Sequence, residues 1–252
     1  MFNRSLLYGE GIFETIKWKG VTKRLRLHYD RLKASAEFFS IDCPEWDEFI
    51  DQILKRVGDE KNIYVKVCLF AIGDDIFFKN PEGGFLQIIK KPLPVIPQSV
   101  SLTISKFRKH SANPIIYHKT INYMFNILVK REALKKGYYD GIVLNERGEV
   151  TECSSSNIII LKGSRLYTPA HECGLLWGTT LSILSQKMDI KQERLRLPDI
   201  MKADAIFIAN AIIDVLPVLN VEGKQFNYEE DLHKELLHVL SFEDSVLSQK
   251  IK

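Results

Sequence analysis

The chain has 252 residues, of which 45% are hydrophobic, so it is long enough to bury a substantial core and is not a disordered chain. Its 35 Lys and Arg residues against 32 Asp and Glu leave a formal charge of +3 without a basic block, which argues against nucleic acid as the main partner. No apolar run approaches the roughly 20 residues needed to span a bilayer, and the N-terminus lacks a signal-peptide pattern, so we expect a cytoplasmic protein with no membrane partner.

The first half of the chain is typical of an α+β unit. A strand over residues 12–18, a Lys-Gly turn and a second strand form a hairpin pattern, and a helix is expected from about Leu27. Apolar residues at helical spacing over 46–57 predict a surface helix that packs on an apolar face. Runs rich in β-branched and aromatic residues predict one antiparallel sheet, with strands at 63–70, 85–89 and 100–104.

The stretch from Arg108 to Tyr117 has no clean periodicity and contains an Asn-Pro pair. We therefore place an interdomain linker at 108–117, between a smaller domain of residues 1–107 and a larger one of residues 118–252. A helix over 120–136, closed by Gly137, is expected to open the second domain. The elements expected after it are strands at 141–144, 157–161 and 165–167, a helix from Gly178, strands at Ala205 and Val215, and a last amphipathic helix from about Tyr228.

The cysteines show no metal-binding or redox pattern, because Cys43, Cys68, Cys153 and Cys173 form neither a C-x-x-C pair nor a zinc spacing. We expect reduced packing thiols and no metal site. A thiol nucleophile at Cys153 stays open, although the sequence offers no identifiable base partner for it.

Four separated features have residue types that suit catalysis: Lys119, Glu152, Arg31 and the helix start at 178–180. Each charged residue, taken singly, is more often a solvated surface group, and Arg31 has the alternative of covering apolar surface with its stem. A glycine followed by two threonines offers backbone amides, hydroxyls and the positive end of a helix dipole, which suits a phosphate. Plain helix capping is the competing interpretation, and the local sequence favours it.

Seven short segments stand out in chain order: Tyr8-Gly-Glu-Gly-Ile-Phe-Glu-Thr15, His28-Tyr-Asp-Arg-Leu-Lys-Ala-Ser35, His118-Lys-Thr-Ile-Asn-Tyr123, Glu149-Val-Thr-Glu-Cys-Ser-Ser-Ser-Asn157, Tyr167-Thr-Pro169, Gly174-Leu-Leu-Trp-Gly-Thr-Thr180 and Ile208-Ala-Asn-Ala211. Together they resemble the class IV family of pyridoxal-phosphate enzymes, which contains branched-chain aminotransferases, D-amino acid aminotransferases and aminodeoxychorismate lyases. The resemblance covers nearly the whole chain. It implies the two-domain α+β / α/β fold of the D-amino acid aminotransferase-like type, with pyridoxal 5′-phosphate in the cleft between the domains, and a homodimer with the site near the interface.

The resemblance also implies roles for individual residues. Lys119 becomes the lysine that holds the cofactor as a Schiff base, Glu152 the carboxylate that faces the pyridine nitrogen, and Arg31 a ligand of the cofactor phosphate. A carboxylate at the ring nitrogen keeps it protonated, so that the ring accepts electrons when the substrate carbon loses a proton. The lysine, once displaced by the substrate amine, is the general base that moves this proton.

Further assignments follow from the same resemblance. It puts Gly178, Thr179 and Thr180 in the phosphate cup and Asn210 near cofactor and substrate, and it suggests Phe13, Arg108 and Asn210 as substrate-binding residues. The sequence also departs from the family pattern. The usual opening strand before Tyr8 is missing or cut short, Leu181 stands where many members have Arg, and Ala211 stands where branched-chain aminotransferases tend to have a phosphate-binding Thr.

Three functions compete. The segments 105–114, 119–122 and 210–218 resemble those of aminodeoxychorismate lyases, which predicts conversion of 4-amino-4-deoxychorismate to 4-aminobenzoate and pyruvate in folate biosynthesis. The first alternative is a class IV aminotransferase that acts on branched-chain or D-amino acids. The second is a non-catalytic homologue that only binds cofactor or partner, which is disfavoured because Lys119 and Glu152 are both present. In each enzymatic case the partner is a small-molecule amine.

Overall fold

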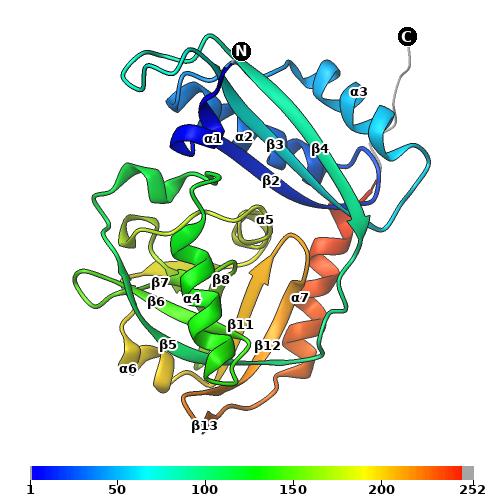
Figure 1. The fold of residues 1–252 in the computed structure, drawn as a ribbon. Coiled ribbons are helices and arrows are strands. Elements are labelled where there is room, and N and C mark those ends of the chain that lie inside the picture. The colour runs from blue at the N-terminus through cyan, green and yellow to red at the C-terminus, as the bar shows by residue number, and fades with distance from the viewer. Residues whose placement is uncertain (1, 246–252) are drawn as a thin grey trace. The chain divides into compact units, whose positions relative to one another are not determined.

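The computed structural model describes residues 2–245, which form two compact units (Figure 1). Within the described range, the N-terminal unit comprises residues 2–94, the segment His118–Asn122 and residues 243–245. The C-terminal unit comprises Val95–Tyr117 and Tyr123–Phe242. A short segment of the N-terminal unit is thus flanked in sequence, on both sides, by stretches of the C-terminal unit.

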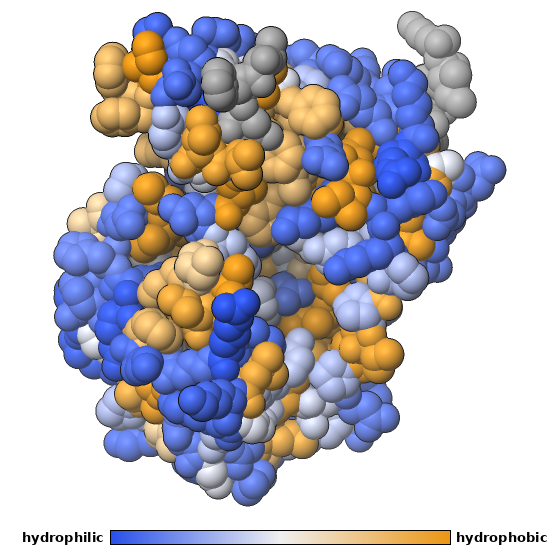
Figure 2. All heavy atoms as spheres, viewed as in Figure 1, coloured by the Kyte–Doolittle hydropathy of each residue, from blue (hydrophilic) through white to orange (hydrophobic). Residues whose placement is uncertain are grey.

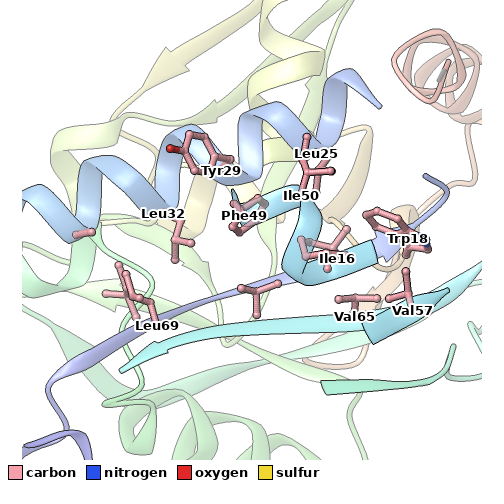
Figure 3. Packing of buried hydrophobic residues seen from close by; sticks show 14 of the residues in the cluster. Ile16, Trp18, Leu25, Tyr29, Leu32, Phe49, Ile50, Val57, Val65 and Leu69 are labelled. Carbon is pink, nitrogen blue, oxygen red and sulfur yellow. The ribbon is translucent and has the colours of Figure 1, made fainter. Parts of the chain in front are cut away.

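The N-terminal unit is built on a four-stranded antiparallel sheet in which β3 pairs with the other three strands. Its elements are β1 (Phe2–Asn3), α1 (Arg4–Tyr8), β2 (Gly11–Trp18), α2 (Lys23–Phe38), α3 (Trp46–Val57), β3 (Ile63–Gly73) and β4 (Gly83–Pro92). Side chains alternate along β2, so Ile16 and Trp18 face α2 and α3 and join the core with Tyr29 and Phe49 (Figure 3). Phe13 lies on the opposite face of the same strand.

The predicted strand and helix of this first half are partly confirmed. Strand 12–18 and helix 46–57 are present as β2 and α3. The second strand of the expected hairpin is absent from the described residues, because α2 begins at Lys23, four residues earlier than expected. Thr22 caps that helix by accepting a hydrogen bond from the Leu25 amide at 3.3 Å, and so stops the chain from continuing as a strand.

The C-terminal unit contains a nine-stranded mixed sheet in the order β10-β9-β8-β11-β12-β5-β6-β7, with β13 added beside β12. The strands are β5 (Val100–Lys109), β6 (Asp140–Asn145), β7 (Val150–Cys153), β8 (Asn157–Lys162), β9 (Arg165–Pro169), β10 (Ile190–Glu193), β11 (Ala205–Asn210), β12 (Asp214–Val221) and β13 (Lys224–Gln225). The helices are η1 (Pro114–Tyr117), α4 (Met124–Lys135), η2 (His171–Cys173), α5 (Thr179–Lys187), α6 (Leu197–Met201) and α7 (Glu230–Phe242). The apolar strand centres form a second core around Ile142, Ile158 and Ile208.

Strand β5 corrects the predicted sheet of the first half. It does not continue the antiparallel sheet of β3 and β4, but lies parallel to and between β12 and β6. Its composition identified a strand but not a partner, and parallel neighbours come from far along the chain. The division between the units accordingly falls after Pro94, not within 108–117.

The helix expected over 120–136 also begins later, at Met124. The residues before it are held in extended form, since Thr120 forms an isolated antiparallel bridge with Ile12 of β2. This pairing assigns the segment 118–122 to the N-terminal unit rather than to the unit that follows it.

Some features are absent from residues 2–245. None of the helices in this range is long and apolar enough to cross a membrane, and no group of three or more His, Cys, Asp or Glu side chains in it is arranged to hold a metal. All four cysteines are free. Burial raises the pKa of the Cys153 thiol well above its ordinary value, which favours a packing thiol over a nucleophile.

Candidate active site

Lys119 is held against the free edge of β2. The Phe13 amide donates to the Lys119 carbonyl at 2.8 Å, and the Ile121 amide donates to the Gly11 carbonyl at 2.9 Å. Gly11 permits this approach, because a Cβ there would lie only 2.9 Å from Cδ1 of Ile121. The backbone of the proposed cofactor lysine is therefore paired with a core strand rather than carried by a solvated loop.

The ring of Phe13 is close to two ammonium groups. Nζ of Lys119 lies 4.6 Å from the ring centroid and Nζ of Lys66 lies 4.0 Å from it. Lys66 comes from β3, where it is paired with Thr15, so it shares the sheet face of Phe13. Sequence reasoning missed Lys66, because only the register between β2 and β3 brings it to this ring.

Arg31 is held in a buried charged cluster. Its Nε and Nη2 donate to the two carboxylate oxygens of Glu14 at 2.7 and 2.6 Å, and Nδ1 of His28 lies 2.6 Å from the same carboxylate. His28 and Arg31 are three residues apart on α2 and so share a helix face. Burial raises the pKa of Glu14, but Arg31 and His28 outweigh it and lower the pKa to about 2. Glu14 therefore keeps its charge at neutral pH and fixes the Arg31 guanidinium.

Glu152 lies on strand β7 and is buried, which excludes the alternative of an exposed loop acid. Its Oε1 accepts from Nζ of Lys109 at 2.5 Å and from the Leu176 amide at 3.1 Å. Asn157 Nδ2 lies 3.4 Å from the other oxygen. Lys109, at the end of β5, was not singled out in the sequence, because nothing local marks a lysine as the buried partner of an acid far along the chain.

The helix start at 178–180 is tied to the same cluster. Gly178 is the N-cap of α5 and its amide donates to Oδ1 of Asn157 at 3.1 Å. A Cβ at Gly178 would lie 2.2 Å from that oxygen, so only glycine fits. Thr179 and Thr180 follow as buried residues of the first helical turn, where backbone amides and the helix dipole favour an anion.

Leu181, which follows them, is fully buried. It packs where many family members have Arg, so this position adds no charge to the helix start.

Asn210 and Arg108 make contacts with the protein itself. Nδ2 of Asn210 donates to the Ser155 carbonyl at 3.1 Å and to Ser156 Oγ at 2.9 Å, which holds the turn that follows Glu152. The Arg108 guanidinium folds back on its own strand and donates to the carbonyls of Ser105 and Phe107.

The structure thus groups the sequence-predicted residues within each unit. In the N-terminal unit it brings Lys119 to Phe13, and it places Arg31 behind the same strand through Glu14. In the C-terminal unit it joins Glu152 to Gly178 through Asn157, with Asn210 supporting the neighbouring turn.

Comparison with known proteins identifies the family of the chain. The model of the family described as Amino-transferase class IV matches residues 11–221, so the chain belongs to this family, whose members are enzymes that use pyridoxal 5′-phosphate. A predicted branched-chain-amino-acid aminotransferase of Methanocaldococcus jannaschii is 28% identical over 91% of this chain and 85% of its own length. The aminodeoxychorismate lyase of Bacillus subtilis is 27% identical over 90% of this chain and 82% of its own length.

Among solved structures, a predicted 4-amino-4-deoxychorismate lyase from Legionella pneumophila superposes with a TM-score of 0.88, at 24% identity, over 97% of this chain and 95% of its own. This likeness confirms the expected fold. The relatives carry different activities, so they define the family and leave the individual reaction open.

Proposed function

We propose that this chain is a pyridoxal-phosphate-dependent enzyme whose cofactor is bonded to Lys119, and that it releases pyruvate from 4-amino-4-deoxychorismate to give 4-aminobenzoate. The main support is the environment of Glu152. The Glu152 carboxylate is buried and paired with Lys109, and two hydrogen bonds through Asn157 connect it to the N-terminus of α5. A carboxylate suits a basic ring nitrogen, and a helix N-terminus suits a phosphate, so both features fit this cofactor.

The donor groups fit this cofactor. The amides and hydroxyls at the start of α5 suit a phosphate, because they are donors at the positive end of a helix dipole. The Arg31 guanidinium, in the other unit, is a residue type that binds phosphate. The glycine at position 178 lets the Asn157 side chain approach the helix start, where a Cβ would collide with it. When bound, the cofactor supplies an electron sink for a substrate carbon that loses a proton.

In this proposal the chain's own residues bind, orient and move a proton. Glu152 would face the ring nitrogen and favour its protonated form, and the ion pair with Lys109 fixes the position of the Glu152 carboxylate. Arg31 and the first amides of α5 hold the phosphate. Lys119 would act as the general base that takes the proton from C4 of the substrate, and enolpyruvate would leave as the six-membered ring of the substrate becomes aromatic.

Two observations favour the lyase over transamination. The segments 105–114, 119–122 and 210–218 resemble those of the lyases, and the Bacillus subtilis relative carries that name. Transamination of branched-chain or D-amino acids is the second candidate, supported by the Methanocaldococcus jannaschii relative. We also propose that the protein works as a cytoplasmic homodimer.

The deciding experiment compares both reactions on one preparation. Purified protein loaded with pyridoxal 5′-phosphate is incubated with 4-amino-4-deoxychorismate, and 4-aminobenzoate and pyruvate are measured. Parallel samples receive branched-chain or D-amino acids with a panel of keto acids. The lyase proposal requires 4-aminobenzoate at a rate well above any transamination. Transamination alone would replace the lyase assignment, and inactivity of a cofactor-loaded protein in both assays would favour a non-catalytic homologue.

A further inference from the structure

The segment that carries Lys119 has few backbone anchors. It enters the N-terminal unit at His118 and leaves it after Asn122, and the chain on both sides belongs to the C-terminal unit. Two backbone hydrogen bonds tie the segment to β2, one on each side of Thr120. Single backbone hydrogen bonds contribute little net stability, so two of them do not by themselves fix a short segment against local opening.

His118, immediately before Lys119, adds a side-chain anchor. Its Nδ1 lies 3.0 Å from Oγ of Ser35. Its ring stacks on Phe38, with centroids 4.3 Å apart and planes at 27°, and meets Phe39 edge-on at 5.0 Å. All three partners belong to the last turn and C-cap of α2, the helix that packs on β2 and carries Arg31.

The two sets of contacts come from two different elements. The backbone of Lys119 is bound by the edge of β2, and the preceding side chain is bound by the end of α2. Burial lowers the pKa of His118, which favours the neutral ring that stacks on an aromatic partner. A phenylalanine would keep the stacking but lose the bond to Ser35, and an alanine would lose both.

We propose that His118 is a positioning residue that fixes the backbone of Lys119, so that the amine returns to the same place after each turnover. The inference rests on the proposed role of Lys119. A lysine that holds the cofactor and also acts as general base must be positioned to within roughly 0.5 Å. Small displacements of catalytic groups reduce the reaction rate by large factors.

The test uses two removals, a rescue and a matched control. His118→Ala removes the whole contact, Phe38→Ala removes the stacking from a half-exposed partner, and His118→Phe restores the ring alone. His238→Ala is the control, because His238 meets Phe242 on α7 with centroids 4.6 Å apart in a His–Phe pair remote in sequence from Lys119.

The first measurement is hydrogen exchange at the Ile121 and Phe13 amides in the cofactor-free protein. The second is the rate at which added pyridoxal 5′-phosphate becomes fixed to Lys119, followed by its visible absorbance and by borohydride reduction with peptide mapping. We expect exchange to accelerate on the order of tenfold and fixation to slow several-fold in His118→Ala and Phe38→Ala. His118→Phe should recover part of both changes, and His238→Ala should match the parent.

The outcomes separate this inference from the proposed function. If borohydride labels Lys119 in the parent and His118→Ala equals the parent in both measurements, His118 is not a positioning residue, and the role of Lys119 stands. If the parent is labelled at another lysine, the proposed function fails and this inference fails with it. Exchange that rises equally in His238→Ala would also overturn the inference, because the effect would then be general loosening.

Discussion

The ring of Phe13 lies near the ammonium groups of both Lys119 and Lys66, so Lys66 must be included in any test of the cofactor lysine. Lys119→Ala should abolish turnover, and borohydride should fix little cofactor, because the bond-forming amine is lost. The sequence motif indicated no replacement amine, but Lys66 lies 4.0 Å from the centroid of the same ring. We therefore expect any residual label in Lys119→Ala to map to Lys66 and to disappear in Lys66→Ala/Lys119→Ala. Full labelling of a lysine elsewhere would contradict the assignment of Lys119.

Glu152 gives the most direct test of the proposed chemistry. Glu152→Gln leaves a neutral amide that stabilises a protonated ring less well, so the proton-removal step should slow on the order of tenfold to a thousandfold. Cofactor should still bind, because bonding to Lys119 does not require the carboxylate. Cofactor content and single-turnover rate are measured on one preparation, with Glu172→Gln as an exposed-acid control. A loaded Glu152→Gln protein at the parental rate would remove Glu152 from the mechanism.

Lys109 should matter for stability as well as for function. Lys109→Met leaves the Glu152 charge buried without its lysine partner, and the loss of one member of such a pair costs about 3 to 5 kcal/mol. Lys109→Met/Glu152→Gln removes the stranded charge and should regain much of this loss. Denaturant unfolding of the parent, both single variants and the double variant measures the coupling. Additive effects in this cycle would show that the two side chains do not stabilise one another.

At the scale of the elements, the cluster between β2 and α2 predicts a dependence of stability on pH. Glu14 is fully buried, and Arg31 and His28 more than offset its burial, so its pKa falls from 4.5 to about 2. A carboxyl with a lowered folded-state pKa stabilises the fold above its unfolded value and loses that contribution as the pH falls toward the folded value. The free energy of unfolding should therefore fall by about 3 kcal/mol from this group between roughly pH 5 and pH 2.

Unfolding curves across that pH range check this expectation. Glu14→Gln should flatten the decline, and Glu37→Gln, an exposed acid on α2, should retain it. Burial also lowers the pKa of His28, so protonation of this ring in acid works in the same direction and leaves a smaller residual slope. Equal slopes in both variants would show that Glu14 does not carry the effect.

The elements also show what the sequence can predict and what it cannot. Strong periodicity identified α3, and apolar runs identified β8 and β11, because these signals are local. The predicted strand partners of β5 were wrong, because strand pairing is decided by contacts between residues far apart in sequence. The same limit applies to the site. The motifs indicated Lys119 and Glu152, but Lys66 and Lys109 reach them only through strand register and tertiary packing.

At the scale of the whole molecule, the surface offers apolar residues that suit association of two copies. Figure 2 shows hydrophobic patches among hydrophilic residues on the face in view. Phe77 and Phe78 are 72% and 76% exposed, and their ring centroids lie 5.5 Å apart. Arg4, itself buried, donates to the carbonyls of Asp74, Ile76, Phe77 and Lys79 and so fixes the loop that presents them. Rigid exposed aromatic residues of this kind are typical anchors of protein interfaces.

The proposed homodimer is therefore expected to weaken when this loop loses its aromatic side chains. Phe77→Ser/Phe78→Ser should shift the protein toward monomer by at least tenfold in dissociation constant, because truncation of central aromatic anchors commonly costs about 2 kcal/mol or more. Val95→Ser is the control, since Val95 is 98% exposed and lies outside the loop. Light scattering with sedimentation at micromolar concentration gives the mass of each protein. A parent that is monomeric would contradict the homodimer, whereas a dimer equally stable in both variants would move its interface away from Phe77 and Phe78.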